Sequence, residues 1–385
     1  MAVDSYGAAI SATHGWRARV ARFFVGRSLA ECVEGGRDNI LQLRLLAALM
    51  VILGHSYGLI GGQQTAYDPV HRILPYTYTH LVGVMMFFMI SGFLITLSWL
   101  RRPDAWRFAR ARVLRLWPAL IVCVVAWAFV LGPLLTNLSL HDYFLAGDKY
   151  GTAHGYVLNT VSLVKVISYL PGLFVDVPAP RNVNNSLWTI PIEATLYVCI
   201  GIAGVLRLFR FPWLMSAAVV VFFAVFLLWP MYRGTYSWAG LAGMGFALAG
   251  FFGAGTIACL LRRYVPISTG LLVVIAAACL YMRTSIHAMQ FIWLAVGYFV
   301  LWFAYVPRIP AIPRGLDLSY GTYLWAFPVQ QVVLQFSHTP NPWVLFALAT
   351  PVVLLIATAS WLWVEKPALR LKNMGLPRTA AAQPA

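Results

Sequence analysis

The first residues that could do chemistry are Arg44 and His55, which stand eleven positions apart in an apolar stretch. At about 100° per residue, this spacing places both side chains on one face of a helix, with a rise of about 16 Å between them. A histidine at that depth in a membrane is costly, so it must face other helices or a wet cavity. Its imidazole could take a proton from an attacking hydroxyl near neutral pH, or simply hydrogen-bond between helices.

Two arginines, Arg112 and Arg115, are three positions apart and are therefore neighbours on one helix face. Such a pair can bind phosphates through bidentate contacts. Together with Arg44 it would form a cationic cluster at the cytoplasmic mouth of a helix bundle. Charge alone favours a simpler interpretation, in which the arginine-rich run from Arg101 onward anchors the protein to anionic lipid headgroups.

Glu193 is the only carboxylate well inside a predicted span. Carboxylates in that environment usually pair with a cation or serve a pathway, so Glu193 could orient an imidazole, act as acid or base, or form a structural ion pair. Trp188 precedes it and could stack on a sugar ring or lie in the aromatic belt at the membrane interface. Further along the chain, Tyr323 could line a cavity or bridge helices.

The cysteines, and the histidines other than His55, do not have the spacing of metal ligands. The five cysteines show no metal-ligand spacing and are interpreted as small core residues. The other histidines, His80 among them, fall in loops or at the ends of predicted spans and receive no role. Walker, Rossmann and G-x-S-x-G patterns do not occur. We therefore predict no metal site and no tightly bound cofactor.

The elements that must position these residues are membrane spans. Of the 385 residues, 61% are hydrophobic and only 10% are charged, whereas a soluble domain carries roughly a quarter charged residues. A spanning helix needs about 17–25 apolar residues, and ten candidates occur at 45–62, 81–100, 116–135, 187–206, 211–230, 239–261, 266–282, 289–307, 316–336 and 342–364. The sequence predicts an all-α, polytopic transmembrane helical bundle of about ten spans.

The charge distribution predicts the orientation of this bundle. Lys and Arg outnumber Asp and Glu 28 to 12, but the basic residues fall mainly in short loops, so the excess indicates membrane orientation and no nucleic-acid partner. With both termini cytoplasmic, the inner segments hold every basic residue except Arg72, Lys149, Lys165, Arg181, Arg233 and Arg283. The excess of inner basic residues is what the positive-inside rule predicts.

Segment 136–186 is ambiguous. Its weakly apolar stretch 156–174 contains Lys165 and Pro171. If this stretch spanned the membrane, every later loop would change sides, so we expect a re-entrant or interfacial segment instead.

The chain is expected to have three parts, without an internal repeat or a cleavable signal. Residues 1–43 form a polar, basic, cytoplasmic extension, 44–372 form the transmembrane domain, and 373–385 form a disordered tail.

Six motifs in this order resemble those of membrane acyltransferase family 3. They are the Arg–ten residues–His pattern of Arg44 and His55, FFMISGFLIT (87–96), the Arg-x-x-Arg pair before Trp117 and Pro118, the Ser-Leu-Trp…Glu block (186–193), SYGTYLWAFPVQ (319–330) and VEKPALRL (364–371). The resemblance implies ten core helices in a bacterial inner membrane and transfer of acyl groups, commonly acetyl, from cytoplasmic acyl-coenzyme A to glycans or lipid-linked sugars. Some relatives carry an additional periplasmic domain, and we expect no counterpart of it among these 385 residues.

This resemblance gives the candidate residues their expected roles. The phosphates of coenzyme A would rest on Arg44, Arg112 and Arg115. His55 would act as general base on the acceptor hydroxyl, with Glu193 orienting the imidazole or contacting the acceptor. The residues assigned to the acceptor are Ser186, Trp188 and Tyr323. The expected partners are acyl-coenzyme A, acetyl-coenzyme A above all, together with a glycan or glycolipid and the lipid bilayer.

Two other classes of protein fit the same residues. A transporter or flippase for a glycan or an anionic solute would use the arginines and the intramembrane histidine as a pathway. A non-catalytic subunit of a polysaccharide export complex is the other class.

Overall fold

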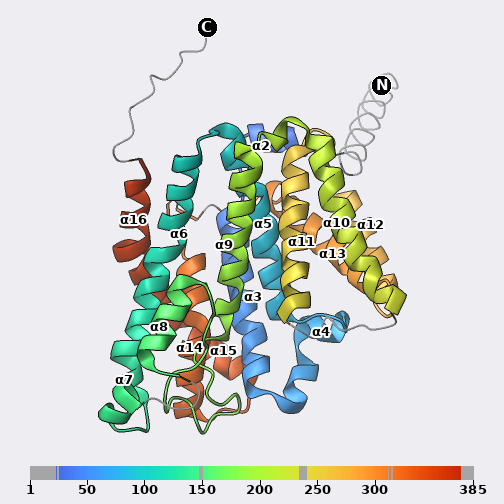
Figure 1. Ribbon diagram of the computed structural model, residues 1–385. Helices are drawn as coiled ribbons and strands as arrows, with labels where there is room; N and C mark the ends of the chain where they lie inside the picture. The colour runs from blue at the N-terminus through green and yellow to red at the C-terminus, as the bar shows by residue number, and fades with distance from the viewer. Residues whose placement is uncertain are drawn as a thin grey trace, which may run out of the picture.

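A computed structural model shows a bundle of long helices (Figure 1). It describes residues 23, 26–146, 151–233, 241–310, 312–313 and 315–373. The predicted disordered tail, apart from Asn373, and most of the N-terminal extension lie outside these residues.

A helix occurs at each of the ten predicted spans. These helices are α3 (Ile40–Ile60), α5 (Thr79–Arg101), α6 (Ala105–Ala126), α9 (Thr189–Val205), α10 (Pro212–Arg233), α11 (Leu241–Leu260), α12 (Thr269–Tyr281), α13 (Ala288–Tyr305), α14 (Ser319–Ser337) and α15 (Pro342–Ser360). Among the described residues, seven helical stretches are long and apolar enough to cross a membrane. The membrane bundle is therefore confirmed, whereas the number of ten spans stays a prediction. One helix that falls short is α12, whose 13 residues extend only about 20 Å.

Shorter elements cover the two ends of the bundle. At the end that holds the start of α3 lie α2 (Leu29–Glu34) and a two-stranded antiparallel pair, β1 (Arg27–Ser28) with β2 (Pro266–Ile267). The opposite end holds α4 (Pro69–Ile73), α7 (Gly132–Leu135) and α8 (Ala153–Ser162) (Figure 1). After α15 the helix continues through a π-helical turn (Trp361–Glu365) into α16 (Lys366–Arg370).

The ambiguous segment does not form a spanning helix. Within its weakly apolar stretch 156–174, helix extends only to Ser162, the last residue of the ten-residue α8 (Ala153–Ser162), and the chain from 163 to 184 is irregular. Side chains of α14 hold the end of this segment in place. Gln331 donates to the carbonyls of Ala179 and Asn182, at 2.9 and 2.7 Å, and Asn184 donates to the carbonyl of Leu324 at 2.8 Å.

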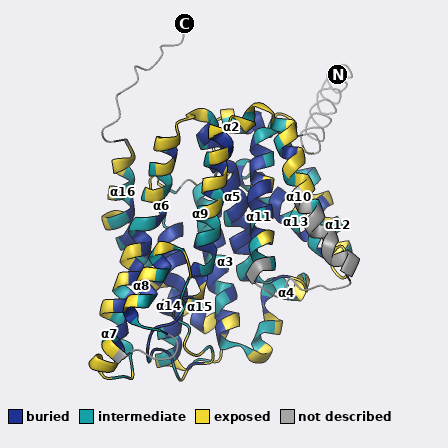
Figure 2. Ribbon diagram, viewed as in Figure 1, coloured by how far each residue is buried: buried dark blue, intermediate teal, exposed yellow. Residues whose placement is uncertain are grey.

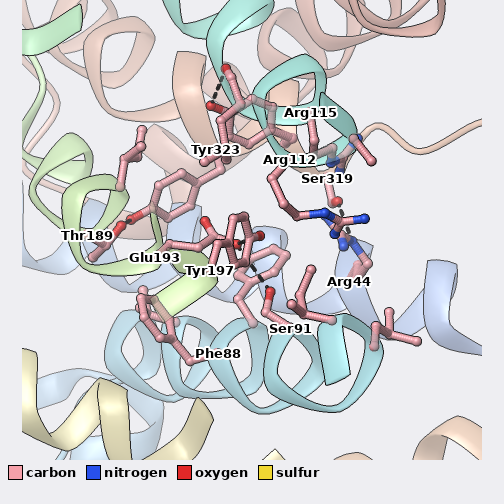
Figure 3. Close-up of a pocket in the computed structure, with 18 of the residues that line it drawn as sticks. Arg44, Phe88, Ser91, Arg112, Arg115, Thr189, Glu193, Tyr197, Ser319 and Tyr323 are labelled. Atoms are coloured by element: carbon pink, nitrogen blue, oxygen red, sulfur yellow. Dashed lines mark hydrogen bonds between the residues drawn. The ribbon is translucent and has the colours of Figure 1, made fainter. Parts of the chain in front are cut away.

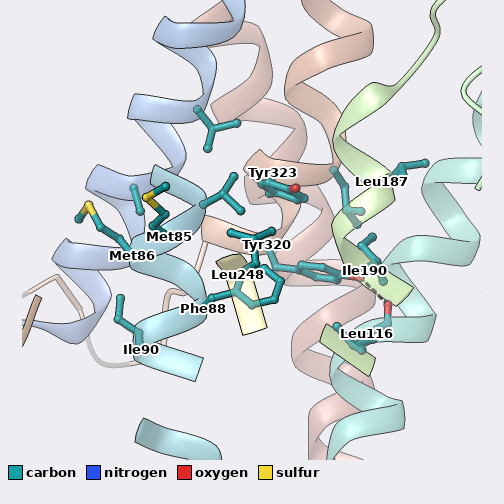
Figure 4. Packing of buried hydrophobic residues seen from close by; sticks show 14 of the residues in the cluster. Met85, Met86, Phe88, Ile90, Leu116, Leu187, Ile190, Leu248, Tyr320 and Tyr323 are labelled. Carbon is teal, nitrogen blue, oxygen red and sulfur yellow. Dashed lines mark hydrogen bonds between the residues drawn. The ribbon is translucent and has the colours of Figure 1, made fainter. Parts of the chain in front are cut away.

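The core lies around α5, which is buried along most of its length (Figure 2). Figure 4 shows Met85, Phe88 and Ile90 of this helix packed among side chains of α6, α9, α11 and α14. Gly92 permits the close crossing of α5 and α11, because a Cβ at this position would stand 1.9 Å from the carbonyl oxygen of Phe252. The glycine of the FFMISGFLIT motif (87–96) therefore serves helix packing.

A second close approach fixes α3 against the start of α5. A Cβ on Gly54 would stand 2.2 Å from the backbone nitrogen of His80, whereas a Cβ on Gly58 of the same helix would meet nothing within 4 Å. We therefore expect Gly54→Ala to lower the thermal unfolding temperature in detergent by several degrees, because the backbones must separate. Gly58→Ala should leave that temperature unchanged or raise it, since alanine favours helix. Equal unfolding temperatures for the two variants would contradict the close contact.

Candidate active site

A cavity of about 160 Å³ lies between α3, α5, α6, α9 and α14 (Figure 3). Five of the residues assigned from the sequence line it: Arg44, Arg112, Arg115, Glu193 and Tyr323. They come from four helices: α3 and α6 carry the arginines, α9 carries the glutamate and α14 carries the tyrosine. The cavity therefore has a cationic side formed by the arginines and a carboxylate and hydroxyl side formed by α9 and α14.

Two of the three arginines are held by carboxylates. Arg115 makes ion pairs with Asp317 at 2.8 Å and with Glu365 at 3.4 Å. Arg44 lies 3.6 Å from the same Asp317 and donates to the Ser319 hydroxyl at 3.0 Å. Asp317 thus bridges the two arginines, and their charges are largely compensated by protein groups.

This bridge should contribute to stability. Asp317→Asn removes the common partner of two arginines whose side chains are only 13% and 18% exposed, and breaking such a pair costs about 3 kcal/mol. The matched control is Asp104→Asn. It removes an exposed pair with Arg107 at 3.6 Å and can preserve the N-cap that Asp104 provides to α6. Thermal unfolding should show a clear loss for the first variant and almost none for the second, and equal effects would argue against the bridge.

Arg112 differs from the other two arginines. Its guanidinium lies over the rings of Phe108 and Tyr197, at 5.7 Å from each centroid. Within the described part of the chain it makes no ion pair, and its buried Nε has no hydrogen-bond partner. Of the three arginines, Arg112 is therefore the one that remains available to an anionic ligand.

Glu193 points toward the cavity from α9 (Figure 3). Its Oε1 accepts hydrogen bonds from the Tyr197 hydroxyl and, at 3.2 Å, from the Ser91 hydroxyl. Its Oε2 accepts none from the described residues, so this oxygen is available to a substrate. Ser91, a residue of the FFMISGFLIT motif, therefore positions a carboxylate.

Of the three residues assigned to the acceptor, only Tyr323 lines the cavity. Its hydroxyl donates to the carbonyl of Ser186 at 2.7 Å and lies 2.6 Å from the Thr189 hydroxyl. Tyr323 therefore fastens the start of α9. Ser186 is buried outside the cavity, and Trp188 packs, partly buried, against the core. Their roles toward an acceptor stay predictions.

His55 does not line this cavity. Its ring lies 5.2 Å from that of Phe327 and 5.1 Å from that of His80. Phe327 follows Tyr323 by one turn of α14, which is about 6 Å along the helix axis, so His55 contacts a residue one turn beyond the lining of the cavity. The Nδ1 atoms of both histidines are buried without a hydrogen-bond partner among the described residues.

His80 received no role from the sequence, because residues in different helices give no spacing to read. No cluster of three or more His, Cys, Asp or Glu that could hold a metal ion occurs in the part of the chain that the structure describes.

Comparison with known proteins points to one family. Residues 38–362 match the family of acyltransferase domains whose motifs were recognised above. An O-acetyl transferase of Shigella phage Sf6 is 28% identical over 343 residues, covering 84% of this chain and 93% of the relative. Nodulation protein 10 of Rhizobium leguminosarum bv. viciae is 25% identical over 364 residues, covering 88% and 95%. No solved structure matches significantly. Since the matched domain spans most of the chain, this protein belongs to the membrane acyltransferase family 3 and is an acyltransferase.

Proposed function

We propose that the protein transfers an acetyl group from cytoplasmic acetyl-coenzyme A to a hydroxyl of a glycan or lipid-linked sugar at the bacterial inner membrane. The observation that carries this proposal is the cavity, which is lined both by Arg112, an arginine without an ion pair among the described residues, and by the carboxylate of Glu193. One relative is named an O-acetyl transferase, which supports the choice of acetyl and of oxygen as the acceptor atom. Family membership does not favour the alternative of a transporter.

The donor would enter from the end of the bundle that carries the arginines, which the charge distribution places in the cytoplasm. A negatively charged donor fits the side of the cavity formed by Arg112, because Arg44 and Arg115 are already occupied by Asp317 and Glu365. The roles expected from the sequence, in which all three arginines bind the phosphates of coenzyme A, are therefore changed. Arg112 would contact the donor, whereas Arg44 and Arg115 would shape its site.

The reaction would take place between Glu193 and His55. The acceptor oxygen attacks the carbonyl carbon of the thioester, the carbon–sulfur bond breaks, and the hydroxyl proton ends on the released thiol by way of a base. Glu193 has a free carboxylate oxygen in the cavity. His55 can act as that base only if the cavity becomes longer by one turn of α14, from Tyr323 to Phe327, when the substrate binds. Such a change is compatible with catalysis, because catalytic contacts often tighten only in the complex with substrate.

Surface glycans provide the test in cells. Cells that lack the protein should lose base-labile acetyl esters from one surface glycan, and the cloned gene should restore them. Export of that glycan should continue in both strains. Unchanged acetylation together with loss of the glycan from the surface would instead support a transporter or an export subunit.

A further inference from the structure

A second cavity, of about 390 Å³, adjoins the first at the end of the bundle where α5 ends and α6 begins. We call it the mouth pocket. Five cationic side chains line it: Arg101, Arg102, Arg107, Arg112 and Lys372. We call the first cavity, which Arg112 and Glu193 line, the central cavity. The two cavities share Leu94, Ala111, Arg112 and Lys372. The two spaces are therefore adjacent, with Arg112 in the wall common to both.

The charges of the mouth pocket are poorly compensated. None of the described carboxylates lines it, and Arg107 has a partner in Asp104 at 3.6 Å. Arg101, Arg102 and Lys372 make no ion pair with any described residue. Like charges gathered around one hollow repel each other, so such a pocket is suited to a ligand that carries several negative charges.

The small size of the central cavity also favours a ligand that extends into the mouth pocket. At about 160 Å³ it is smaller than pockets that enclose a drug-sized ligand, which are roughly 300–1,000 Å³. It can hold the reactive end of a donor but not a nucleotide with its phosphates. The mouth pocket, at about 390 Å³, supplies additional room directly beside it.

We infer that the mouth pocket binds phosphate groups through Arg101, Arg102 and Lys372, and that these belong to the nucleotide part of the acyl donor. The inference rests on the proposed function and deepens it by moving the phosphate site away from Arg44 and Arg115. Lipid headgroups offer the same phosphate chemistry, and a run of arginines next to a membrane also suits them. The concave shape and the wall shared with the central cavity favour the donor.

The test uses the full-length protein in nanodiscs of phosphatidylcholine, which contain no anionic headgroup. Arg101→Gln combined with Arg102→Gln should weaken binding of radiolabelled coenzyme A by about tenfold or more, because two charge-assisted contacts are lost. Adenosine 3′,5′-bisphosphate should displace labelled coenzyme A from the wild type, and this competition should weaken to the same degree in the variant. The charge-matched control is Arg210→Gln combined with Arg263→Gln. It removes two arginines at the same end of the bundle that do not line the mouth pocket.

Equal affinities of the two double variants for coenzyme A would overturn the inference. If the Arg101→Gln, Arg102→Gln variant binds coenzyme A more weakly than the wild type only in nanodiscs that contain phosphatidylglycerol, the pocket belongs to lipid headgroups, and the inference is overturned too. Binding is measured without an acceptor, so the result is separate from the proposed function. A protein that binds coenzyme A through Arg101 and Arg102 but acetylates no glycan would contradict only the latter.

Discussion

Glu193→Gln is expected to reduce acyl transfer by about 10²–10⁴-fold, the usual contribution of a positioned acid or base. Glutamine has nearly the same shape, and its carbonyl oxygen can still accept the hydrogen bonds of Tyr197 and Ser91. The substitution thus removes the charge and the basicity and retains the contacts. Initial rates with labelled acetyl-coenzyme A, together with equilibrium binding of coenzyme A, separate loss of chemistry from loss of donor binding.

The matched control for this variant is Ser91→Ala. It deletes one hydrogen bond of 3.2 Å to Glu193 and retains the carboxylate, so the rate should fall only several-fold, in line with about 1 kcal/mol for such a bond. If Glu193→Gln lost no more activity than Ser91→Ala, Glu193 would be a structural residue.

The second large effect is expected at His55. His55→Ala should lower the transfer rate by about 10²–10⁴-fold if the imidazole accepts the proton of the acceptor hydroxyl. Affinity for coenzyme A should stay within about twofold, because His55 lies outside the cavity that contains the arginines. Single-turnover transfer rates at saturating donor provide the measurement.

His55→Gln distinguishes a base from an interhelical contact. Glutamine can hydrogen-bond between helices but cannot exchange a proton near neutral pH. A base therefore predicts that the Gln variant is as inactive as the Ala variant. Recovery of most of the activity by Gln would show that His55 only holds the helices together.

Much of the helical framework and five residues of the cavity could be predicted from the sequence. A long apolar stretch predicts a helix, because the backbone N–H and C=O groups of a membrane span must hydrogen-bond within the protein. Spacing within one helix placed Arg112 and Arg115 together, and Glu193 was singled out because no other carboxylate lies well inside a predicted span.

Contacts between distant segments could not be predicted in this way. Asp317 and Glu365 pair with Arg115 across 202 and 250 positions of the chain, and no spacing rule connects them. The same holds for His80, which meets His55 only because Gly54 lets two helices approach closely. The depth of His55 was estimated from one helix alone, whereas its separation from the cavity depends on Phe327 of α14.

The proposed reaction is tested most directly by measuring acetyl transfer by the purified protein. Wild-type protein in nanodiscs, given radiolabelled acetyl-coenzyme A and the glycan whose acetylation it restores in cells, should form a labelled, base-labile ester on that glycan. Glu193→Gln should bind coenzyme A equally well and form almost none. Equal ester formation by both proteins, or none by the wild type, would contradict the central claim that acyl transfer takes place in the cavity between Arg112 and Glu193.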